Sequence, residues 1–179
     1  MEPYIPFRAF NIYNGFILCD DHLTIMRLTD YTDYSLRALM YLGMHRDRLV
    51  TIQDIADAYN ISKSHLMKVV HQLGVAGLIE TIRGRSGGLR LGKEPEDINI
   101  GDVVRGTEPD FMMVECFNRD HNECVLAPSC ELQSVLGKAT KAYLAVLSEV
   151  TLADLLRKSP SLQKLAKVHL PSRDKTKVA

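Results

Sequence analysis

The sequence predicts a mainly α-helical protein with a small β-wing: a winged helix-turn-helix followed by a long C-terminal dimerisation helix. Three observations support this fold class. Two apolar patterns of helical spacing flank a short turn at residues 60–61. A hairpin pattern rich in glycine and arginine follows at residues 78–91. A further helical apolar pattern occupies residues 130–150, and it is more apolar than a small winged helix needs for its own core, which favours a homodimer interface over packing on its own domain.

Composition and charge limit the class of protein. The chain has 179 residues, of which 46% are hydrophobic, so we expect a packed core. We find neither a secretory signal nor an apolar run long enough to cross a membrane, which predicts a cytoplasmic protein without a membrane partner. In that compartment clustered cysteines more often bind metal or do redox work than form disulfides, which stay the alternative.

The net charge is +0, but the charges are segregated along the chain. Residues 26–93 hold ten Lys and Arg against six Asp and Glu, residues 94–156 hold four against twelve, and residues 157–179 hold seven against one. Affinity for phosphates is local, so the first block can bind DNA although the whole chain is neutral. An ordinary solvated surface would show the same charges.

The N-terminal residues 1–25 contain two prolines and scattered aromatic residues without a sustained period. They predict an appended arm, either disordered or present because an upstream start codon was chosen instead of Met26; a short apolar strand docked on the body is the alternative. A DNA-binding domain is predicted for residues 26–93. Its first helix begins near Thr29, and Gly43 is placed to end it.

Two short helices then form the predicted helix-turn-helix. Thr51 is a suitable N-cap for the first and Ser62 for the second, with Asn60 in the turn between them. The second helix of such a pair enters the major groove of DNA. The inner faces of the two helices are Ile52, Ile55, Ala56 and Tyr59, then Leu66, Val69, Val70 and Leu73.

The hairpin LIETIRGRSGGLRL predicts the wing, from which Arg83, Arg85 and Arg90 project. Such arginines can follow the phosphates or enter the minor groove. A solvated hairpin tip or an anion-binding loop is the alternative, but no G-K-[ST] follows, as a Walker-type phosphate loop requires. The orientation of His71 and Gln72 stays open. The predicted DNA contacts are Ser62, Lys63, Ser64, His65 and Lys68 on the recognition helix, and Arg83 and Arg85 on the wing.

The rest of the chain carries the cysteines. Residues 94–157 are predicted to form a cysteine loop and the dimerisation helix, with Thr151 capping a last short helix, and residues 158–179 a basic, disordered tail. The spacing of Cys116, Cys124 and Cys130 is C-x7-C-x5-C, and Cys19 lies too far away to take part. Thiolates suit iron–sulfur clusters, zinc or copper(I), but zinc modules favour cysteines two to four residues apart. Without paired carboxylates, a Ser/His/Asp set or a nucleotide loop, the sequence does not indicate an enzyme.

At these residues the chain resembles a known family, the iron–sulfur winged-helix regulators that include NsrR, IscR and RirA. The resemblance runs from MRLTDYTDYSLRALMYL at Met26 to about Leu156, through TIQDIADAYNISKSHLMKVVHQL, RGRSGGLRLGK and the three cysteines. YTDYSLRAL, SHLMKVVHQL, IGDVVRGTEPDF and TLADLL are most similar to NsrR-type repressors, which sense nitric oxide. IscR-like members have a histidine ligand three residues after the last cysteine, where this chain has Gln133.

The resemblance implies a homodimer with one iron–sulfur cluster per subunit, 4Fe–4S in preference to 2Fe–2S, on Cys116, Cys124 and Cys130. It also implies that the intact cluster permits binding to double-stranded operator DNA. Nitric oxide would destroy the cluster, release the repressor and switch on nitric-oxide detoxification genes. Three alternatives remain: an iron-responsive repressor like RirA, which has similar cysteine spacing; a zinc-stabilised DNA-binding protein without sensing; and an enzyme, which no motif supports.

The fourth cluster ligand is open in the sequence. The family pattern indicates Asp33, the aspartate of YTD, reaching across from the partner subunit. A carboxylate is a weak ligand for such iron, which suits a reactive site. The alternative is that Asp33 is simply an acidic residue favoured by the helix dipole at the start of a helix. The remaining candidates are Asp30, His121 and Glu123.

Overall fold

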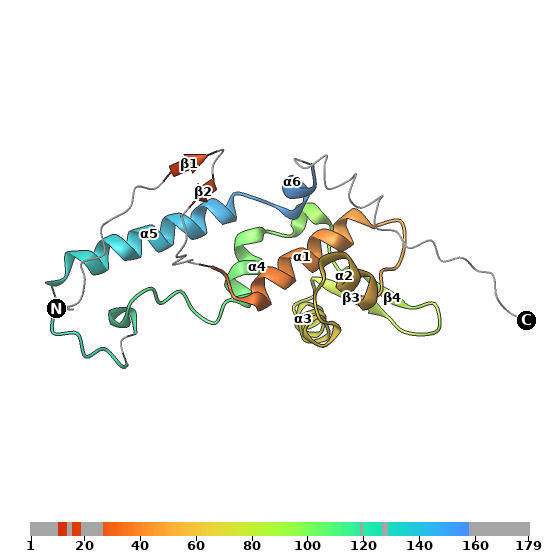
Figure 1. Cartoon of the computed structure of the whole chain (residues 1–179), viewed down its shortest axis with the longest axis horizontal. Helices are drawn as coiled ribbons and strands as arrows, with labels where there is room; N and C mark the ends of the chain where they lie inside the picture. Colours follow the sequence, from red (N-terminus) through yellow and green to blue (C-terminus); the bar gives the residue numbers. More distant parts are fainter. Residues whose placement is uncertain (1–10, 14–15, 19–26, 119, 127–128, 158–179) are drawn as a thin grey trace, which may run out of the picture.

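The computed structural model describes residues 11–13, 16–18, 27–118, 120–126 and 129–157. In this part of the chain, helices and one wing hairpin form a compact body, and a long helix extends from its side (Figure 1). The predicted fold class is therefore confirmed. The predicted basic tail and Cys19 lie outside the described residues, and within these residues no helix is long and apolar enough to cross a membrane.

The three helices start where the sequence predicts them. Thr29 is the N-cap of α1 (Asp30–Met44), Thr51 of α2 (Ile52–Tyr59) and Ser62 of α3 (Lys63–Val75), and each side-chain oxygen accepts a hydrogen bond from a backbone N–H of its helix. Such bonds satisfy donors that the first helical turn leaves unpaired. Asn60 adopts the left-handed conformation between α2 and α3, which makes the sharp turn of the helix-turn-helix.

The core lies between α1, α2, α3 and the hairpin. The predicted inner face of α3 is confirmed, since its four apolar residues are 6% exposed or less. Strands β3 (Ile79–Ile82) and β4 (Gly88–Leu91) pair antiparallel, with Ile79 opposite Leu91. Val50, just before α2, pairs with Leu89 of β4, so the wing is attached to the helix pair by backbone hydrogen bonds as well as by packing.

The C-terminal half returns to α1. After the 3-10 turn η1 (Pro95–Asp97), α4 (Ile100–Thr107) and α6 (Leu152–Arg157) both pack against α1. Between them the chain runs through η2 (Glu115–Phe117) and the long helix α5 (Glu131–Ser148). All residues of α5 are described and none of them is buried. Although α5 packs on α4, it leaves apolar side chains open to solvent among the described residues: Leu132 is 61%, Val135 55% and Val146 63% exposed.

Two details differ from the sequence analysis. Helix α1 continues through Gly43 to Met44, so the role predicted for Gly43 is wrong. A Cβ at Gly43 would lie 2.6 Å from the side chain of Leu156, so this glycine instead allows α6 to approach α1 closely. The N-terminal arm contains two short antiparallel strands, β1 (Asn11–Tyr13) and β2 (Phe16–Leu18), whereas a single short strand was only the alternative interpretation of its sequence.

Candidate nucleic-acid interface and cysteine loop

The recognition helix α3 presents its predicted DNA-contacting residues to solvent. All five, Ser62, Lys63, Ser64, His65 and Lys68, are exposed. The apolar residues of the same helix face the core, so its polar side is free to enter a groove. The imidazole of His65 stacks on the Tyr34 ring of α1, with centroids 6.3 Å apart, which connects the first turn of α3 to the N-terminal part of α1.

Three further residues of α3 are exposed beside this set. His71 and Gln72, whose orientation the sequence left open, both face solvent. Met67 was not selected from the sequence, yet its side chain is 51% exposed. Its position could have been found from the helical period, because Met67 follows Lys63 by four residues and Ser64 by three.

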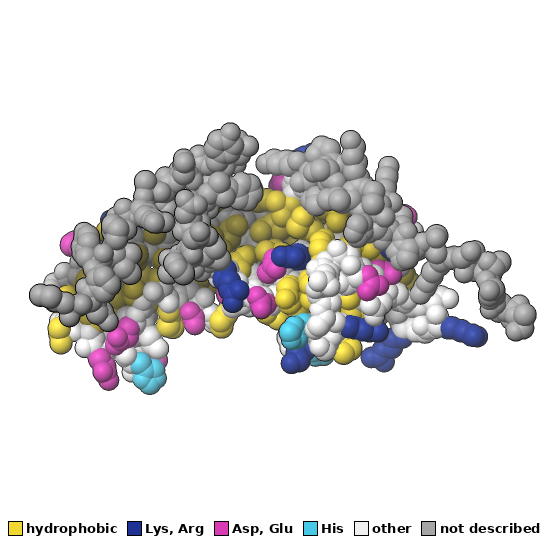
Figure 2. Space-filling model, in the orientation of Figure 1, with side chains coloured by type: hydrophobic (Ala, Val, Ile, Leu, Met, Phe, Trp, Pro, Cys, Tyr) yellow, Lys and Arg dark blue, Asp and Glu magenta, His cyan; other side chains and the backbone are white. Residues whose placement is uncertain are grey.

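The wing carries its basic residues at the tip. Arg83 and Arg85 are exposed on either side of Gly84, whose φ of 117° is a conformation that glycine adopts easily. Arg90 also projects from the hairpin, but it forms an ion pair of 2.8 Å with Glu80 on the neighbouring strand. Lys and Arg side chains gather on the lower edge of the molecule, over α3 and the wing (Figure 2). The recognition helix and the wing, which are the two parts of the predicted interface, therefore lie on one face of the molecule.

The start of α2 holds this interface in place through a capping box. The Asp54 carboxylate accepts hydrogen bonds from the Thr51 backbone N–H (2.9 Å) and the Arg48 guanidinium (3.1 Å). Burial by itself would raise the pKa of Asp54, but the hydrogen bonds from Thr51 and Arg48 together lower it below its usual value. The ionised carboxylate is thus the form that stabilises the fold.

We expect Asp54→Asn to lower the free energy of unfolding at neutral pH by roughly 1 kcal/mol, a loss of about 2–4 °C in Tm. Because the folded pKa is depressed, this contribution is present above the unfolded pKa near 3.8 and is lost as the pH falls through the lower, folded value. Thermal denaturation of both proteins from neutral to acidic pH measures it. Asp57→Asn is the control, since Asp57 is exposed and accepts one bond from Gln53. A Tm difference for Asp54→Asn that persists unchanged in acid would contradict this account.

The cysteine loop lies between α4 and α5. Cys116 is in η2, Cys124 is in the segment that follows, and Cys130 is the N-cap of α5. All three are free thiols and partly exposed. The amide of Gln133 donates a 2.7 Å hydrogen bond to the carbonyl of Cys116, so this residue joins the two ends of the loop.

The three thiols suit an iron–sulfur cluster in their chemistry, although the chain does not gather them into a ligand set. Among the described residues, no three His, Cys, Asp or Glu side chains are close enough together to hold a metal ion. The thiols are reduced, accessible and on a single loop. No side chain caps the start of α5 at Cys130.

Asp33 lies in the first turn of α1, where its carboxylate pairs with Arg37 at 2.7 Å. Both side chains are more than two-fifths exposed, so the pair is weak and its carboxylate can be redirected. The Arg37 guanidinium also lies 5.9 Å from the centre of the Tyr59 ring. Of the remaining ligand candidates, Asp30, His121 and Glu123 are all exposed.

Comparison with known proteins identifies the family. The Rrf2 family, described as iron-dependent transcriptional regulators, matches residues 28–158. The chain belongs to the Rrf2 family. It is therefore a DNA-binding transcriptional regulator, as its helix-turn-helix and wing predict, and the match covers both the interface and the cysteine loop.

Relatives and a solved structure agree with this assignment. The HTH-type transcriptional regulator NsrR of Bacillus licheniformis is 57% identical over 141 residues, which are 78% of this chain and 99% of the relative. The protein of the same description from Bacillus subtilis is 56% identical over 144 residues, 80% of this chain and 99% of the relative. The structure of T. potens IscR matches with a TM-score of 0.63 and 27% identity, covering 77% of this chain and 91% of that one.

In this Rrf2 regulator, the segment that leads to the cysteines is bonded to the DNA-binding domain. The Glu108 carboxylate, just after α4, accepts hydrogen bonds from the backbone N–H (2.8 Å) and the hydroxyl (3.1 Å) of Thr29. Thr29 is the N-cap of α1, the helix that carries Asp33 and Tyr34. Further along, the Thr140 hydroxyl of α5 donates to the sulfur of Met113 at 3.1 Å. The cysteine loop is thus connected to both α1 and α5.

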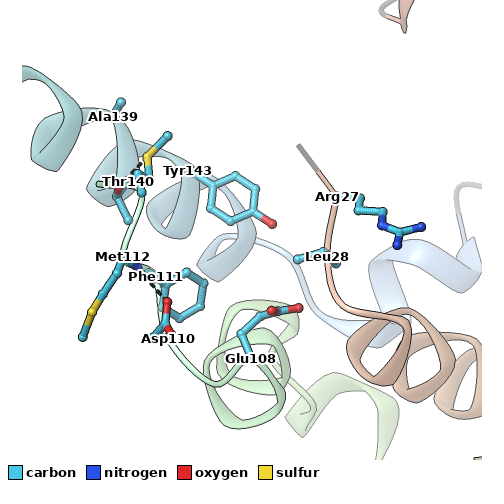
Figure 3. Close-up of a pocket in the computed structure, with 10 residues that line it drawn as sticks. Arg27, Leu28, Glu108, Asp110, Phe111, Met112, Ala139, Thr140 and Tyr143 are labelled. Carbon is cyan, nitrogen blue, oxygen red and sulfur yellow. Dashed lines mark hydrogen bonds between the residues drawn. The ribbon is translucent and has the colours of Figure 1, made fainter. Parts of the chain in front are cut away.

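A cavity of about 440 Å³ lies at this junction. Its walls come from Leu28 before α1, Phe111 and Met112 before η2, and Ala139 and Tyr143 of α5. Figure 3 shows Tyr143 directed from α5 toward Leu28 and Glu108. Burial, and then the negative charge of Glu108, raise the pKa of Tyr143, which keeps the phenol neutral. The cavity thus lies where the segment leading to the cysteines, the start of α1 and α5 meet.

Proposed function

We propose that this Rrf2 regulator is a homodimeric repressor that senses nitric oxide through an iron–sulfur cluster held by Cys116, Cys124 and Cys130. The observation that carries the proposal is the set of three free thiols on one loop whose N-terminal side is bonded, through Glu108, to the N-cap of α1. High identity to proteins described as NsrR, over nearly their whole length, supports the choice among sensors of this family.

The cluster is proposed as 4Fe–4S, one per subunit, in preference to 2Fe–2S. When bound, it would supply iron that reacts with nitric oxide, a small neutral molecule. The chain's part is to present the three thiolates and to keep the loop partly accessible, as all three cysteines are. Gln133 occupies the position of the histidine ligand in IscR-like proteins and instead braces the loop through the Cys116 carbonyl.

The residues between loop and DNA supply a route for the signal. An ordered loop holds Glu108 on Thr29, and the start of α1 then holds Tyr34 against His65 of the recognition helix. Hydrogen bonds to a charged acceptor are worth about 1.5–3 kcal/mol each. A free-energy change of about 1.4 kcal/mol changes an equilibrium constant tenfold. Loosening the two hydrogen bonds from Thr29 to the Glu108 carboxylate is therefore enough to change operator occupancy substantially.

Dimerisation gives the recognition helices their spacing. A helix-turn-helix dimer reads two half-sites about one turn of DNA apart. The exposed apolar face of α5 is the surface we assign to the second copy. The loop adds to it, because Val125 is 90% and Leu126 65% exposed beside Cys124. Large apolar side chains exposed together in a single chain indicate a protein interface.

Two alternatives differ from the proposal, one in the signal that is sensed and the other in the metal that is bound. An iron-supply sensor of the same fold would hold a similar cluster and respond to iron depletion, in keeping with the family's description as iron-dependent. A zinc-stabilised protein would be colourless, whereas an iron–sulfur protein is brown. The spacing of the thiols disfavours zinc.

The test is a titration of nitric oxide into protein purified without oxygen, following the visible absorbance and the affinity for a DNA duplex selected by the protein. We expect both to fall together, over the same range of nitric oxide per cluster. Iron chelation, applied separately, distinguishes the iron sensor. If nitric oxide removes the absorbance and leaves DNA binding intact, the proposed sensing is wrong.

Asp33 of the partner subunit is our proposed fourth ligand, with Arg37 as its competitor within one chain. We expect Asp33→Ala to assemble a cluster, because three thiolates remain. Its spectrum should change, it should be lost faster in air, and its rate of reaction with nitric oxide should differ. Asp47→Ala, which removes an exposed carboxylate in the turn after α1 that is not a ligand candidate, is the matched control. A spectrum and a reaction rate identical to wild type would direct attention to His121.

A further inference from the structure

An exposed methionine lies on the recognition helix. Met67 is in the second turn of α3 and 51% exposed, while the next apolar residue of the helix that is comparably open, Val75, is at the C-terminal end. Exposing a long thioether to water is unfavourable, whereas covering it gains about 25 cal/mol per Å². Single exposed apolar side chains are common on protein surfaces, so Met67 is informative through its position among the predicted DNA contacts, where a bound duplex would cover it.

No other surface among the described residues covers it. Leu66 and Val70, its neighbours on the inner side, are already 6% exposed or less, so Met67 is not an unfilled part of the core. The proposed dimer surface lies on α5, and α5 packs on α4, not on α3. Met67 instead shares its side of the helix with Lys63, Ser64 and His71, at spacings of four, three and four residues. This is the polar side that carries the predicted DNA contacts.

The chemistry of the major groove then selects the ligand. Base edges there present hydrogen-bond donors and acceptors, which suit Lys63, Ser64 and His71. The thymine C5-methyl is the apolar group among them, and methionine can offer neither a strong donor nor a strong acceptor. An apolar side chain in the N-terminal half of a recognition helix can thus distinguish thymine from the other three bases.

We propose that Met67 is a specificity residue that reads a thymine methyl group in each operator half-site. The inference rests on the proposed function, because it requires α3 to lie in the major groove. It goes beyond that function in naming the base and the atom recognised. In a symmetric dimer the same contact is made twice, once in each half-site.

The experiment removes the thymine methyl group and the Met67 side chain separately. A duplex is selected from a random-sequence library by full-length, cluster-loaded wild-type protein, and each thymine is then replaced in turn by uracil, which lacks only the methyl group. Affinities are measured for wild type, Met67→Ala and the control Val75→Ala. Val75 is 73% exposed on the same helix but lies eight residues further on, about 12 Å along its axis.

For one symmetric pair of thymines we expect wild type to lose about fourfold per uracil, and about fifteenfold for both. Met67→Ala should bind the thymine duplex more weakly than wild type and should be insensitive to those uracils. Val75→Ala should behave like wild type. Repeating the selection with Met67→Gln should remove the preference for thymine at that position, because an amide pairs with adenine instead.

Equal sensitivity to every uracil in wild type and Met67→Ala would overturn the assignment of Met67 while leaving operator binding through α3 in place. If wild type selects no duplex at all, the proposed function itself is wrong and this inference with it. The two failures are therefore distinguishable within one set of measurements.

Discussion

Replacing Cys124 with Ser should abolish the iron–sulfur absorbance of this protein and reduce its affinity for operator DNA to the non-specific level. Cys124 is the middle thiol of the loop, and the other two thiols among the described residues are already assigned to the proposed cluster, so none is left to replace it. The non-specific level is typically lower than specific affinity by a factor of 10³ or more. Absorbance after anaerobic purification and a DNA-binding titration at fixed salt measure the two effects. Cys116→Ser and Cys130→Ser should give the same result.

The serine substitution also separates loss of the cluster from loss of the fold. Cys124 is partly exposed and takes no part in the buried core, so the helical circular dichroism of the variant should match that of wild type. Cys19→Ala is the matched control, because the arm cysteine is proposed to have no role in the cluster. A Cys124→Ser protein that keeps the full absorbance would remove this residue from the proposed ligand set.

The second large effect is expected from the wing. Removing both Arg83 and Arg85 should weaken operator binding by about 1–3 kcal/mol for each arginine that reads a groove edge, and by less for one that contacts only phosphate. The two side chains are exposed at the tip and make no ion pair among the described residues, so their charge is available to DNA. Affinity measured across salt concentrations separates the cases, because each lost phosphate contact lowers the slope of log K against log salt by about 0.9.

Arg90→Ala is the control for charge on the same hairpin. Its guanidinium is held by Glu80 at 2.8 Å, so its removal should change affinity and salt slope less than removal of either tip residue. An Arg83→Ala, Arg85→Ala protein with wild-type affinity and wild-type salt slope would exclude the wing from DNA contact. Binding would then depend on α3 alone.

Local sequence features predicted the DNA-binding domain well. Thr29, Thr51 and Ser62 each cap the helix that was expected to follow, because an N-cap needs only a side-chain oxygen within three residues of the N–H that it accepts from. The inner face of α3 followed from a period that every helix obeys. Gly43 was misinterpreted for the opposite reason. Its role depends on Leu156, more than a hundred positions away in the chain, and no local pattern reports that contact.

Some features of the candidate site were likewise predicted from the sequence, and others became visible only in the folded structure. The exposure of Ser64, Lys68, Arg83 and Arg85 and the free thiols of the loop follow from residue type and spacing, and so does membership of the Rrf2 family. The bonds of Glu108 to Thr29, 79 residues apart, the stacking of Tyr34 on His65 and the exposure of Met67 became visible only when the helices were packed. The physical reason is range. Capping and amphipathic periodicity act within a few residues along the chain, whereas the route from cysteine loop to recognition helix consists of contacts between side chains that only the folded core brings together.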